Sequence, residues 1–356
     1  MLEARLRKTF PPQPDSAGFA LDLEFSVTAG VTVLFGPSGA GKTLVLDSIA
    51  GFVKPDEGRV LLDDAILFDG ASHVNLPPQQ RNCGYVFQNY ALFPHMTLRE
   101  NLEFAAERRP RLERHRRVTE MLEKFHLTET AGRRPHEVSG GQRQRCSIAR
   151  ALIGAPKLLL LDEPATGLDA ALRAEFYQAL RQVRSEFETP IMLVTHDLEE
   201  CFELGEEMLV LSGGKLIQSG TPRHVLDQPA NLDVARILGA FNVLDAEIKT
   251  LDPGRNTSRL QVGEFEFEGT YFPGHLKGDR VRLCVRPEQL SVSTRQGKLE
   301  PNQMPGELLR SIETPRGMRL EFANGIAVAL PHNEFSRLRD SRDWVIHFPS
   351  DALRVV

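Results

Sequence analysis

Apolar runs separated by helical stretches organise the first two thirds of the chain. Five of these runs predict strands, at 20–27, 31–36, 157–164, 190–197 and 207–220. Two of them, LLLLD and IMLVTH, are continuously apolar, which indicates a central sheet covered on both faces. One face of a predicted helix within 171–188 carries Leu172, Phe176, Ala179, Leu180 and Val183. The pattern is typical of an α/β domain.

After about residue 240 the pattern changes to short strand-like runs punctuated by Gly, Pro and Asn. The runs lie at 241–251, 259–269, 279–292, 306–313, 318–330 and 344–356. Short strands with turn residues between them predict an all-β barrel or sandwich. We therefore expect two domains, an α/β domain at 1–235 and a β domain at 236–356.

A glycine-rich loop, GPSGAGKT, joins a predicted strand to a predicted helix and matches the pattern G-x-x-x-x-G-K-[ST]. Backbone N–H groups of such a loop wrap a phosphate, and the helix N-terminus adds partial positive charge. Lys42 would reach the β- and γ-phosphates, and the Thr43 hydroxyl would bind Mg²⁺. The residues expected to bind the nucleotide here are Gly36, Pro37, Ser38, Gly39, Ala40, Gly41, Lys42 and Thr43.

Two acidic residues, Asp162 and Glu163, follow the apolar run LLLL. An aspartate at the end of a buried strand can hold Mg²⁺ directly or through water. The next acid can orient or deprotonate a water aimed at the γ-phosphate. An acidic pair after a strand is common by itself. Its presence together with the phosphate loop favours a role in catalysis.

A second candidate anion site lies in the stretch VSGGQRQR at 138–145. Ser139, Gly140 and Gly141 open a predicted helix, and a helix N-terminus favours an anion. The alternative is an ordinary helix cap with two glycines. Because one nucleotide does not need two phosphate cradles in one chain, the second cradle is expected to serve a nucleotide held by another subunit.

Bulk composition limits the class of protein. The 356 residues are 41% hydrophobic and 26% charged, with no run of eighteen apolar residues and no signal-like apolar region in MLEARLRKTF. A net charge of −5 gives no basic footprint for nucleic acid, and the basic stretch 107–117 reads as a solvated helix face. The four cysteines are expected to be free thiols in a reducing compartment; they are Cys83, Cys146, Cys201 and Cys284.

Six motifs in order over residues 31–197 resemble the ATP-binding cassette (ABC) family. The phosphate loop is followed by Gln88, the signature VSGGQ, the acidic LLLLDEP, the loop ATGLD and His196. The resemblance implies a head-to-tail dimer that sandwiches two ATP molecules. Ser139 and Gly141 of one subunit would then face the γ-phosphate held by Lys42 of the other.

The resemblance also implies individual roles. Gln88 would sense Mg²⁺ and contact a membrane partner, and Glu163 would polarise the attacking water. His196 would bond the γ-phosphate and fix its position, and Asp169 would belong to a loop that crosses the dimer interface. Without the family, His196 could as well be a packing histidine at a strand end. The implied catalytic residues are Glu163, His196 and Lys42. Further nucleotide contacts are implied for Gln88, Ser139, Gly140, Gly141, Asp162 and Asp169, and Mg²⁺ contacts for Thr43, Gln88 and Asp162.

The sequence departs from the family pattern in three places. Val138 replaces the usual signature Leu, and ATGLD replaces the commoner small-residue SALD type, where Gly167 would loosen the interface loop. The early Tyr-Gly pair that stacks on adenine in many members is missing. Phe10 and Phe19 are both candidates for that stacking role.

The motifs fit three classes of ABC protein, namely an importer ATPase, a fused exporter and a soluble repair, chromosome or translation protein. The lack of a membrane span, the lack of sustained heptads between Lys42 and Ser139, and the single cassette favour the importer. The stretches 282–292 and 306–331 resemble oligomer-binding-like β domains of importer ATPases for oxyanions, polyamines and sugars. In that group these domains mediate dimer contacts and sometimes bind the transported anion; a structural appendage is the alternative.

The opening stretch, with its short GVT entry to the loop, looks most like the ATPase of molybdate importers. Sulfate or another oxyanion, a polyamine and a sugar are the alternative cargoes. The resemblance implies ATP and Mg²⁺ as cofactors and a location on the cytoplasmic face of the membrane. The implied partners are a second copy of the chain, integral-membrane permease subunits and, indirectly, an extracytoplasmic binding protein, with no nucleic acid.

The segment 89–105 after Gln88 is unusually apolar. Exposed apolar clusters usually mark an interaction site, and in the family this region receives a short permease helix. Burial within the cassette's own helical subdomain is the alternative.

Overall fold

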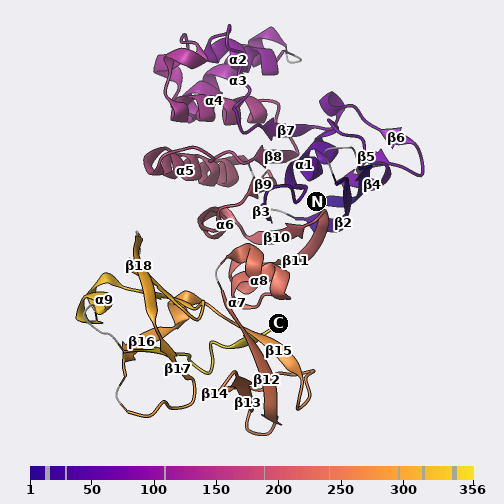
Figure 1. Cartoon of the computed structure of the whole chain (residues 1–356). Coiled ribbons are helices and arrows are strands. Elements are labelled where there is room, and N and C mark those ends of the chain that lie inside the picture. The colour runs from indigo at the N-terminus through magenta and orange to yellow at the C-terminus, as the bar shows by residue number, and fades with distance from the viewer. Residues whose placement is uncertain are drawn as a thin grey trace. The chain divides into compact units, whose positions relative to one another are not determined.

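The computed structural model describes residues 1–12, 17–28, 30–107, 110–187, 189–239, 241–295, 297–314, 317–338 and 343–356. The chain divides into two compact units, Met1–Val225 and Leu226–Val356. Figure 1 shows the course of the chain through both units. The helix predicted within 171–188 is present as α5 (Ala170–Phe187), and residue 188 lies outside the described residues. Four of the five predicted strands are present as single strands, whereas the stretch 207–220 forms two strands, β10 and β11.

A six-stranded sheet forms the centre of the first unit, in the order β11-β10-β3-β9-β8-β7. Its inner strands β3, β8 and β9 are mostly apolar, and every residue in them except Asp162 is buried, as expected of strands covered on both faces. Only β11 runs antiparallel to its neighbour. The strands are β3 (Val31–Phe35), β7 (Cys83–Val86), β8 (Leu158–Asp162), β9 (Ile191–Thr195), β10 (Glu207–Ser212) and β11 (Lys215–Gly220).

A second, antiparallel sheet in the order β2-β1-β4-β5-β6 belongs to the same unit. Leu2, Ala4 and Leu6 alternate with exposed residues along β1, so that one face of the strand enters the core. Helix α1 (Lys42–Ala50) touches β1, β8 and β9 and therefore lies between the two sheets. The strands are β1 (Leu2–Phe10), β2 (Phe19–Val27), β4 (Glu57–Leu62), β5 (Ala65–Asp69) and β6 (Val74–Asn75).

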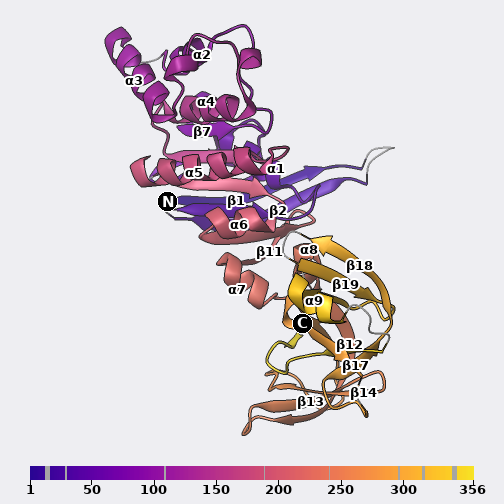
Figure 2. The same ribbon diagram turned by 90° about the vertical axis from the view of Figure 1, so that its left-hand side faces the viewer.

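Helices α2, α3 and α4 gather beyond β7 as a separate layer (Figures 1 and 2). On α5, four of the five residues predicted to share a face are buried, and Leu172 is half-buried. Helices α5 and α6 lie on the side of the six-stranded sheet away from α1 (Figure 1). The bounds are α2 (Leu98–Ala105), α3 (Arg111–Lys124), α4 (Gly140–Leu152), α5 (Ala170–Phe187), α6 (Leu198–Leu204) and α7 (Pro222–Asp227), with 3₁₀ turns at Pro78–Gln80, Thr128–Thr130 and Pro135–Glu137.

The described part of the second unit is mostly β, as expected, and it also contains the short helices α8 and α9. Three sheets enclose one core that includes Ile248, Phe267, Leu283, Phe322 and Ile346. The five-stranded sheet has the order β14-β13-β12-β15-β22, and the smaller sheets are β16-β21-β17 and β18-β19-β20. The bounds are α8 (Leu232–Leu238), β12 (Asn242–Asp252), β13 (Thr257–Val262), β14 (Phe265–Thr270), β15 (Arg280–Val285), a 3₁₀ turn (Pro287–Gln289), β16 (Ser291–Thr294), β17 (Gln303–Gly306), β18 (Leu308–Thr314), β19 (Gly317–Phe322), β20 (Ala327–Leu330), α9 (His332–Leu338), β21 (Trp344–His347) and β22 (Arg354–Val355).

Among the described residues, no helix is long and apolar enough to cross a membrane. All four cysteines are free thiols, as the sequence predicted.

Candidate nucleotide-binding site

The phosphate loop connects β3 to α1, as the apolar pattern predicted. Gly41 caps α1 with a φ of 98°, in the left-handed region that favours glycine. A Cβ atom at Gly41 would also lie 2.9 Å from Cζ of the Phe19 ring. Both the backbone conformation and the close approach of Phe19 therefore require glycine at this position.

Lys42 begins α1 and is buried, with 5% of its surface exposed. Its Nζ donates hydrogen bonds to the carbonyl oxygens of Gly36 at 2.8 Å and Pro37 at 3.0 Å. Burial lowers the pKa of Lys42, and the nearby carboxylates of Glu163 and Asp162 oppose that shift. A cation is thus held over the loop in a position where phosphate oxygens can replace the two carbonyls.

Thr43 and Asp162 are brought together although they come from different elements. The Thr43 hydroxyl donates to Oδ1 of Asp162 at 3.0 Å. Burial raises the pKa of Asp162, and the hydrogen bond from Thr43 opposes the shift. A hydroxyl and a carboxylate fit Mg²⁺, which takes few protein oxygens together with substrate phosphates. In the described part of the chain, no group of three or more His, Cys, Asp or Glu could hold a metal by itself.

Glu163 follows Asp162 in the sequence, and its side chain lines the pocket beside the phosphate loop. Its φ is 43°, a strained value for a residue with a side chain, and its N–H donates to the carbonyl of Val194 at 3.1 Å. Its Oε2 lies 3.4 Å from Nδ1 of His196 and accepts a hydrogen bond from Thr166 at 3.2 Å. The carboxylate and the imidazole predicted to be catalytic therefore lie next to each other.

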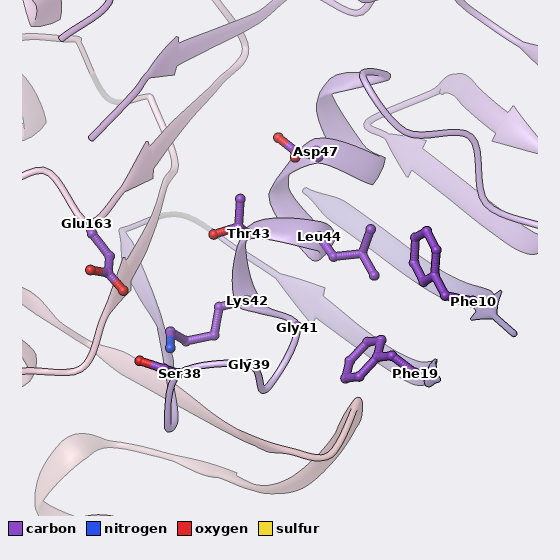
Figure 3. A pocket seen from close by; sticks show the side chains of 10 residues that line it. All are labelled: Phe10, Phe19, Ser38, Gly39, Gly41, Lys42, Thr43, Leu44, Asp47 and Glu163. Atoms are coloured by element: carbon purple, nitrogen blue, oxygen red, sulfur yellow. The ribbon is translucent and has the colours of Figure 1, made fainter. Parts of the chain in front are cut away.

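A pocket of about 490 Å³ surrounds the loop (Figure 3). Its volume is in the range of small-molecule and cofactor sites. Phe10 and Phe19 lie at one end of it and Glu163 at the other, so both aromatic candidates line the pocket. The lining residues are Phe10, Phe19, Ser38, Gly39, Gly41, Lys42, Thr43, Leu44, Asp47 and Glu163.

Asp47 lines the pocket and was not singled out from the sequence. It lies four residues after Thr43, on the same face of α1, and this spacing is the signal that could have revealed it. Its Oδ1 accepts a hydrogen bond from the Tyr85 hydroxyl at 3.0 Å. Burial raises the pKa of Asp47, and the bond from Tyr85 opposes the shift.

Gln88 is exposed and is not among the residues that line this pocket. It follows β7, which pairs in parallel with β8 so that Val86 is opposite Leu161. Because parallel strands end at the same edge of a sheet, Gln88 and Asp162 leave the sheet at that edge. The Mg²⁺-sensing role implied for Gln88 stays a prediction.

The signature residues open α4, as the sequence predicted. The Ser139 hydroxyl accepts from the Gln142 N–H at 3.2 Å, and the Gln142 side chain accepts from the Ser139 N–H at 3.0 Å. Ser139 is exposed, and Gly141 lies against α5, where a Cβ would approach Cδ2 of Leu172 to 2.8 Å. Within one chain this helix start is therefore a capping box, and its residues are not part of the pocket lining.

Asp169 precedes α5 and accepts a hydrogen bond from the Leu172 N–H at 2.9 Å. In the single chain it therefore acts as a cap for α5.

Three known proteins share most of their length with this chain. Spermidine/putrescine import ATP-binding protein PotA of Nitratidesulfovibrio vulgaris is 41% identical, over 77% of this chain and 73% of that protein. Molybdenum import ATP-binding protein ModC of Paramagnetospirillum magneticum is 36% identical, over 77% and 76%. Molybdate/tungstate import ATP-binding protein WtpC of Pyrococcus horikoshii is 38% identical, over 76% and 74%.

Solved structures of ATP-binding cassette proteins are also similar to this chain. A dimeric ATP-binding cassette in a post-hydrolysis state with ADP and Pi superposes with a TM-score of 0.53 and 28% identity, over 63% of this chain and 99% of that one. The cbiO1 protein of Clostridium perfringens, part of an ABC transporter complex, gives 0.55 and 26%, over 66% and 92%. The family model for ABC transporters matches residues 21–166. Together with the relatives above, these matches show that the chain belongs to the ABC transporter family, as an ATP-binding subunit of the import type.

Proposed function

We propose that this chain binds MgATP in the pocket around Lys42 and hydrolyses it to drive import through separate permease subunits. Membership of the import branch makes it an ATPase coupled to transport. The observation that carries the residue assignment is the contact of Thr43 with Asp162 at 3.0 Å, beside the buried Lys42 ammonium and the Glu163 carboxylate.

The residues of the pocket divide the work of phosphoryl transfer. Lys42 exchanges its bonds to the two loop carbonyls for bonds to phosphate oxygens. Thr43 and Asp162 would hold Mg²⁺, which when bound supplies positive charge to the phosphates. Glu163 orients the attacking water and accepts its proton at Oε2, and His196, 3.4 Å away, keeps that carboxylate in place.

The second half of the site comes from a second copy of the chain. Ser139 is exposed at the start of α4 and lies outside the pocket of its own chain, which supports a role toward a nucleotide held by a partner subunit. The matched cassette with ADP and Pi is itself dimeric. We place the homodimer on the cytoplasmic face of the membrane, in contact with the permease, with an extracytoplasmic binding protein as the indirect partner.

Molybdate is the cargo favoured by the opening stretch of the sequence, and the relatives divide between two cargoes. One is named for spermidine and putrescine, and two are named for molybdenum or molybdate/tungstate. Their identities of 41%, 36% and 38% favour neither cargo. We therefore propose molybdate and the polyamines as the two candidate cargoes. We assign Leu226–Val356 to dimerisation and regulation.

Uptake in intact cells tests this function. Deletion of the gene should abolish uptake of labelled molybdate in one assay or of labelled putrescine in the other, and the chain supplied in trans should restore it. Restoration should fail with Lys42→Ala. Unchanged uptake of both cargoes after deletion would reject both assignments. Absence of ATP-dependent phosphate release from the purified chain would reject the ATPase site.

A further inference from the structure

Gln88 occupies a hydrogen-bonded turn with a strained exit. The N–H of Tyr90 donates to the carbonyl of Phe87 at 2.9 Å, and the N–H of Ala91 donates to that of Asn89 at 2.7 Å. Tyr90 has a φ of 62° and Ala91 one of 46°. Two consecutive residues with side chains in the left-handed region persist only where their surroundings hold them.

Two side chains of α4 hold this exit. The Ser147 hydroxyl donates to the Tyr90 carbonyl at 2.9 Å. The Arg150 guanidinium donates to the Ala91 carbonyl at 2.7 Å and to the Tyr90 carbonyl at 3.2 Å. Together, three side-chain donors therefore fix two adjacent carbonyls at the strained point.

Two of these three bonds are partly shielded from water, and the bond from Arg150 to the Ala91 carbonyl is exposed. Ser147 is fully buried, and burial lowers the pKa of Arg150. Arg150 itself is half-buried, so loss of the two carbonyls would leave a partly desolvated cation with fewer hydrogen bonds. The arginine and the turn therefore stabilise each other's position.

The same helix reaches the other parts of the site. It begins at Ser139, and with a rise of 1.5 Å per residue Ser147 lies about 12 Å further along its axis. Gln144, buried between these two residues, donates to the carbonyl of Pro164 at 2.6 Å, directly after Glu163. One rigid helix thus contacts the Gln88 turn, the Glu163 strand end and the signature start.

We propose that Ser147 and Arg150 are positioning residues that lock the turn carrying Gln88 to α4, so that the turn and the signature move as one piece. This rests on the proposed function, because the Mg²⁺-sensing role of Gln88 comes from it. The alternative is that the contacts of Ser147 and Arg150 with the turn only stabilise the fold. In that case any substitution that destabilises α4 equally should change the Mg²⁺ requirement by the same amount.

Two measurements on the full chain separate these alternatives. Hydrogen exchange in the nucleotide-free protein reports on the amides of residues 87–92. In a Glu163→Gln background, the Mg²⁺ concentration for half-maximal ATP-dependent dimerisation reports on the site. The test variants are Arg150→Ala, Arg150→Lys and Ser147→Ala. The matched control is Ile148→Val, which loosens the buried side of α4 without touching the turn.

Arg150→Ala should speed exchange in residues 87–92 and raise the Mg²⁺ requirement roughly tenfold, as expected for loss of charge-assisted hydrogen bonds. Arg150→Lys keeps a charged donor group, so its exchange rate and its Mg²⁺ requirement should both lie between those of Arg150→Ala and the parent. Ser147→Ala should raise both quantities by a smaller amount. Ile148→Val should change the unfolding midpoint but neither other readout.

The proposal is overturned if Arg150→Ala and Ser147→Ala both leave exchange and the Mg²⁺ requirement at parent values. It is also overturned if Ile148→Val shifts the Mg²⁺ requirement as much as they do. If the Glu163→Gln parent itself does not bind ATP or dimerise, the proposed function fails, and the nucleotide-free exchange still decides whether α4 holds the turn. Should Arg150→Ala not fold, Arg150→Lys and Ser147→Ala carry the same test.

Discussion

The Thr43 hydroxyl donates to Oδ1 of Asp162 across 3.0 Å, although 119 positions separate the two residues in sequence. Thr43 lies in the first turn of α1, and Asp162 is the last residue of β8. Their contact joins the phosphate loop to the acidic strand end. Glu163 is the next residue, so the carboxylate that we propose to orient water lies one position from the oxygens expected to face Mg²⁺.

Glu163→Gln should lower steady-state ATP hydrolysis roughly 100-fold or more, because the amide cannot accept the proton of the attacking water. ATP binding should remain, since Lys42 and the loop are untouched. Phosphate release and ATP binding by the purified chain are the measurements. Glu203→Gln, which alters an exposed ion pair with Arg181, is the matched control and should keep parental hydrolysis. Near-parental phosphate release from Glu163→Gln would reject the assignment.

The phosphate loop and the acidic pair could be predicted because both are local patterns next to strongly apolar strands. The runs before Gly36 and Asp162 are buried throughout, so pattern and structure agree there. The strand Leu2–Phe10 was missed, although Leu2, Ala4 and Leu6 alternate as a half-buried strand should.

Other parts of the site depend on contacts between distant residues, which a single sequence does not reveal. Phe10 and Phe19 both reach the pocket because they are opposite each other in the β1–β2 pair. The strained turn at Tyr90 is held from α4, 57 to 60 residues away. Neither relationship follows from local propensity, since each is fixed by tertiary packing.

Ser139→Arg should block ATP-dependent dimerisation in the Glu163→Gln background while each monomer still binds ATP. The bulky cation would occupy the approach that the partner's γ-phosphate is expected to use. Size-exclusion chromatography with ATP is the measurement. Ser139→Ala is the control for loss of the α4 N-cap, which by itself lowers the free energy of unfolding by roughly 1 kcal/mol.

Ser185→Arg places the same side chain on the exposed face of α5 and should dimerise normally. If Ser139→Arg also dimerises, the assignment of the signature to a partner's nucleotide fails.

Glu200 on α6 should make stability depend on pH. It is 3% exposed, and its Oε1 lacks a hydrogen-bond partner in the described structure. Burial raises the pKa of Glu200 from 4.5 to about 7, and Asp197 adds to the shift, while a hydrogen bond from Thr195 and the charges of Arg173 and His196 oppose it. Between pH 4.5 and about 7, Glu200 is therefore protonated in the folded state and ionised in the unfolded chain. This contribution to stability is complete below pH 4.5 and is lost as pH rises through about 7.

Glu200→Gln should accordingly stabilise the protein at pH 8 by about 1–3 kcal/mol and have little effect at pH 5. Urea unfolding of the full chain at the two pH values is the measurement. Glu203→Gln, on the same helix but exposed, should show no such difference. Equal effects of Glu200→Gln at both pH values would contradict the linkage.

The apolar segment 89–105 is only partly open to a partner. Leu98 and Leu102 are fully buried, and Phe93 is half-buried with its ring centroid 4.8 Å from that of Phe104. Asn101 holds the loop before α2 together through bonds to the backbone of Phe93 and Met96. The expected cluster is therefore partly a core of the helical layer, and Phe104 is its exposed edge.

Phe104 is 50% exposed, so Phe104→Asp should weaken binding to the permease while leaving the fold and the isolated ATPase intact. A charge within an apolar contact would have to be desolvated on docking, which should weaken association at least roughly tenfold. Co-purification with the permease and ATPase assays of the purified chain are the two measurements. Leu112→Asp is the matched control, because Leu112 is 90% exposed on the neighbouring α3 and lies outside the segment. A Phe104→Asp chain that hydrolyses ATP and still co-purifies and supports uptake at the parental level would exclude this edge from the docking surface. An equal loss with Leu112→Asp would instead indicate a general effect of added negative charge on the helical layer.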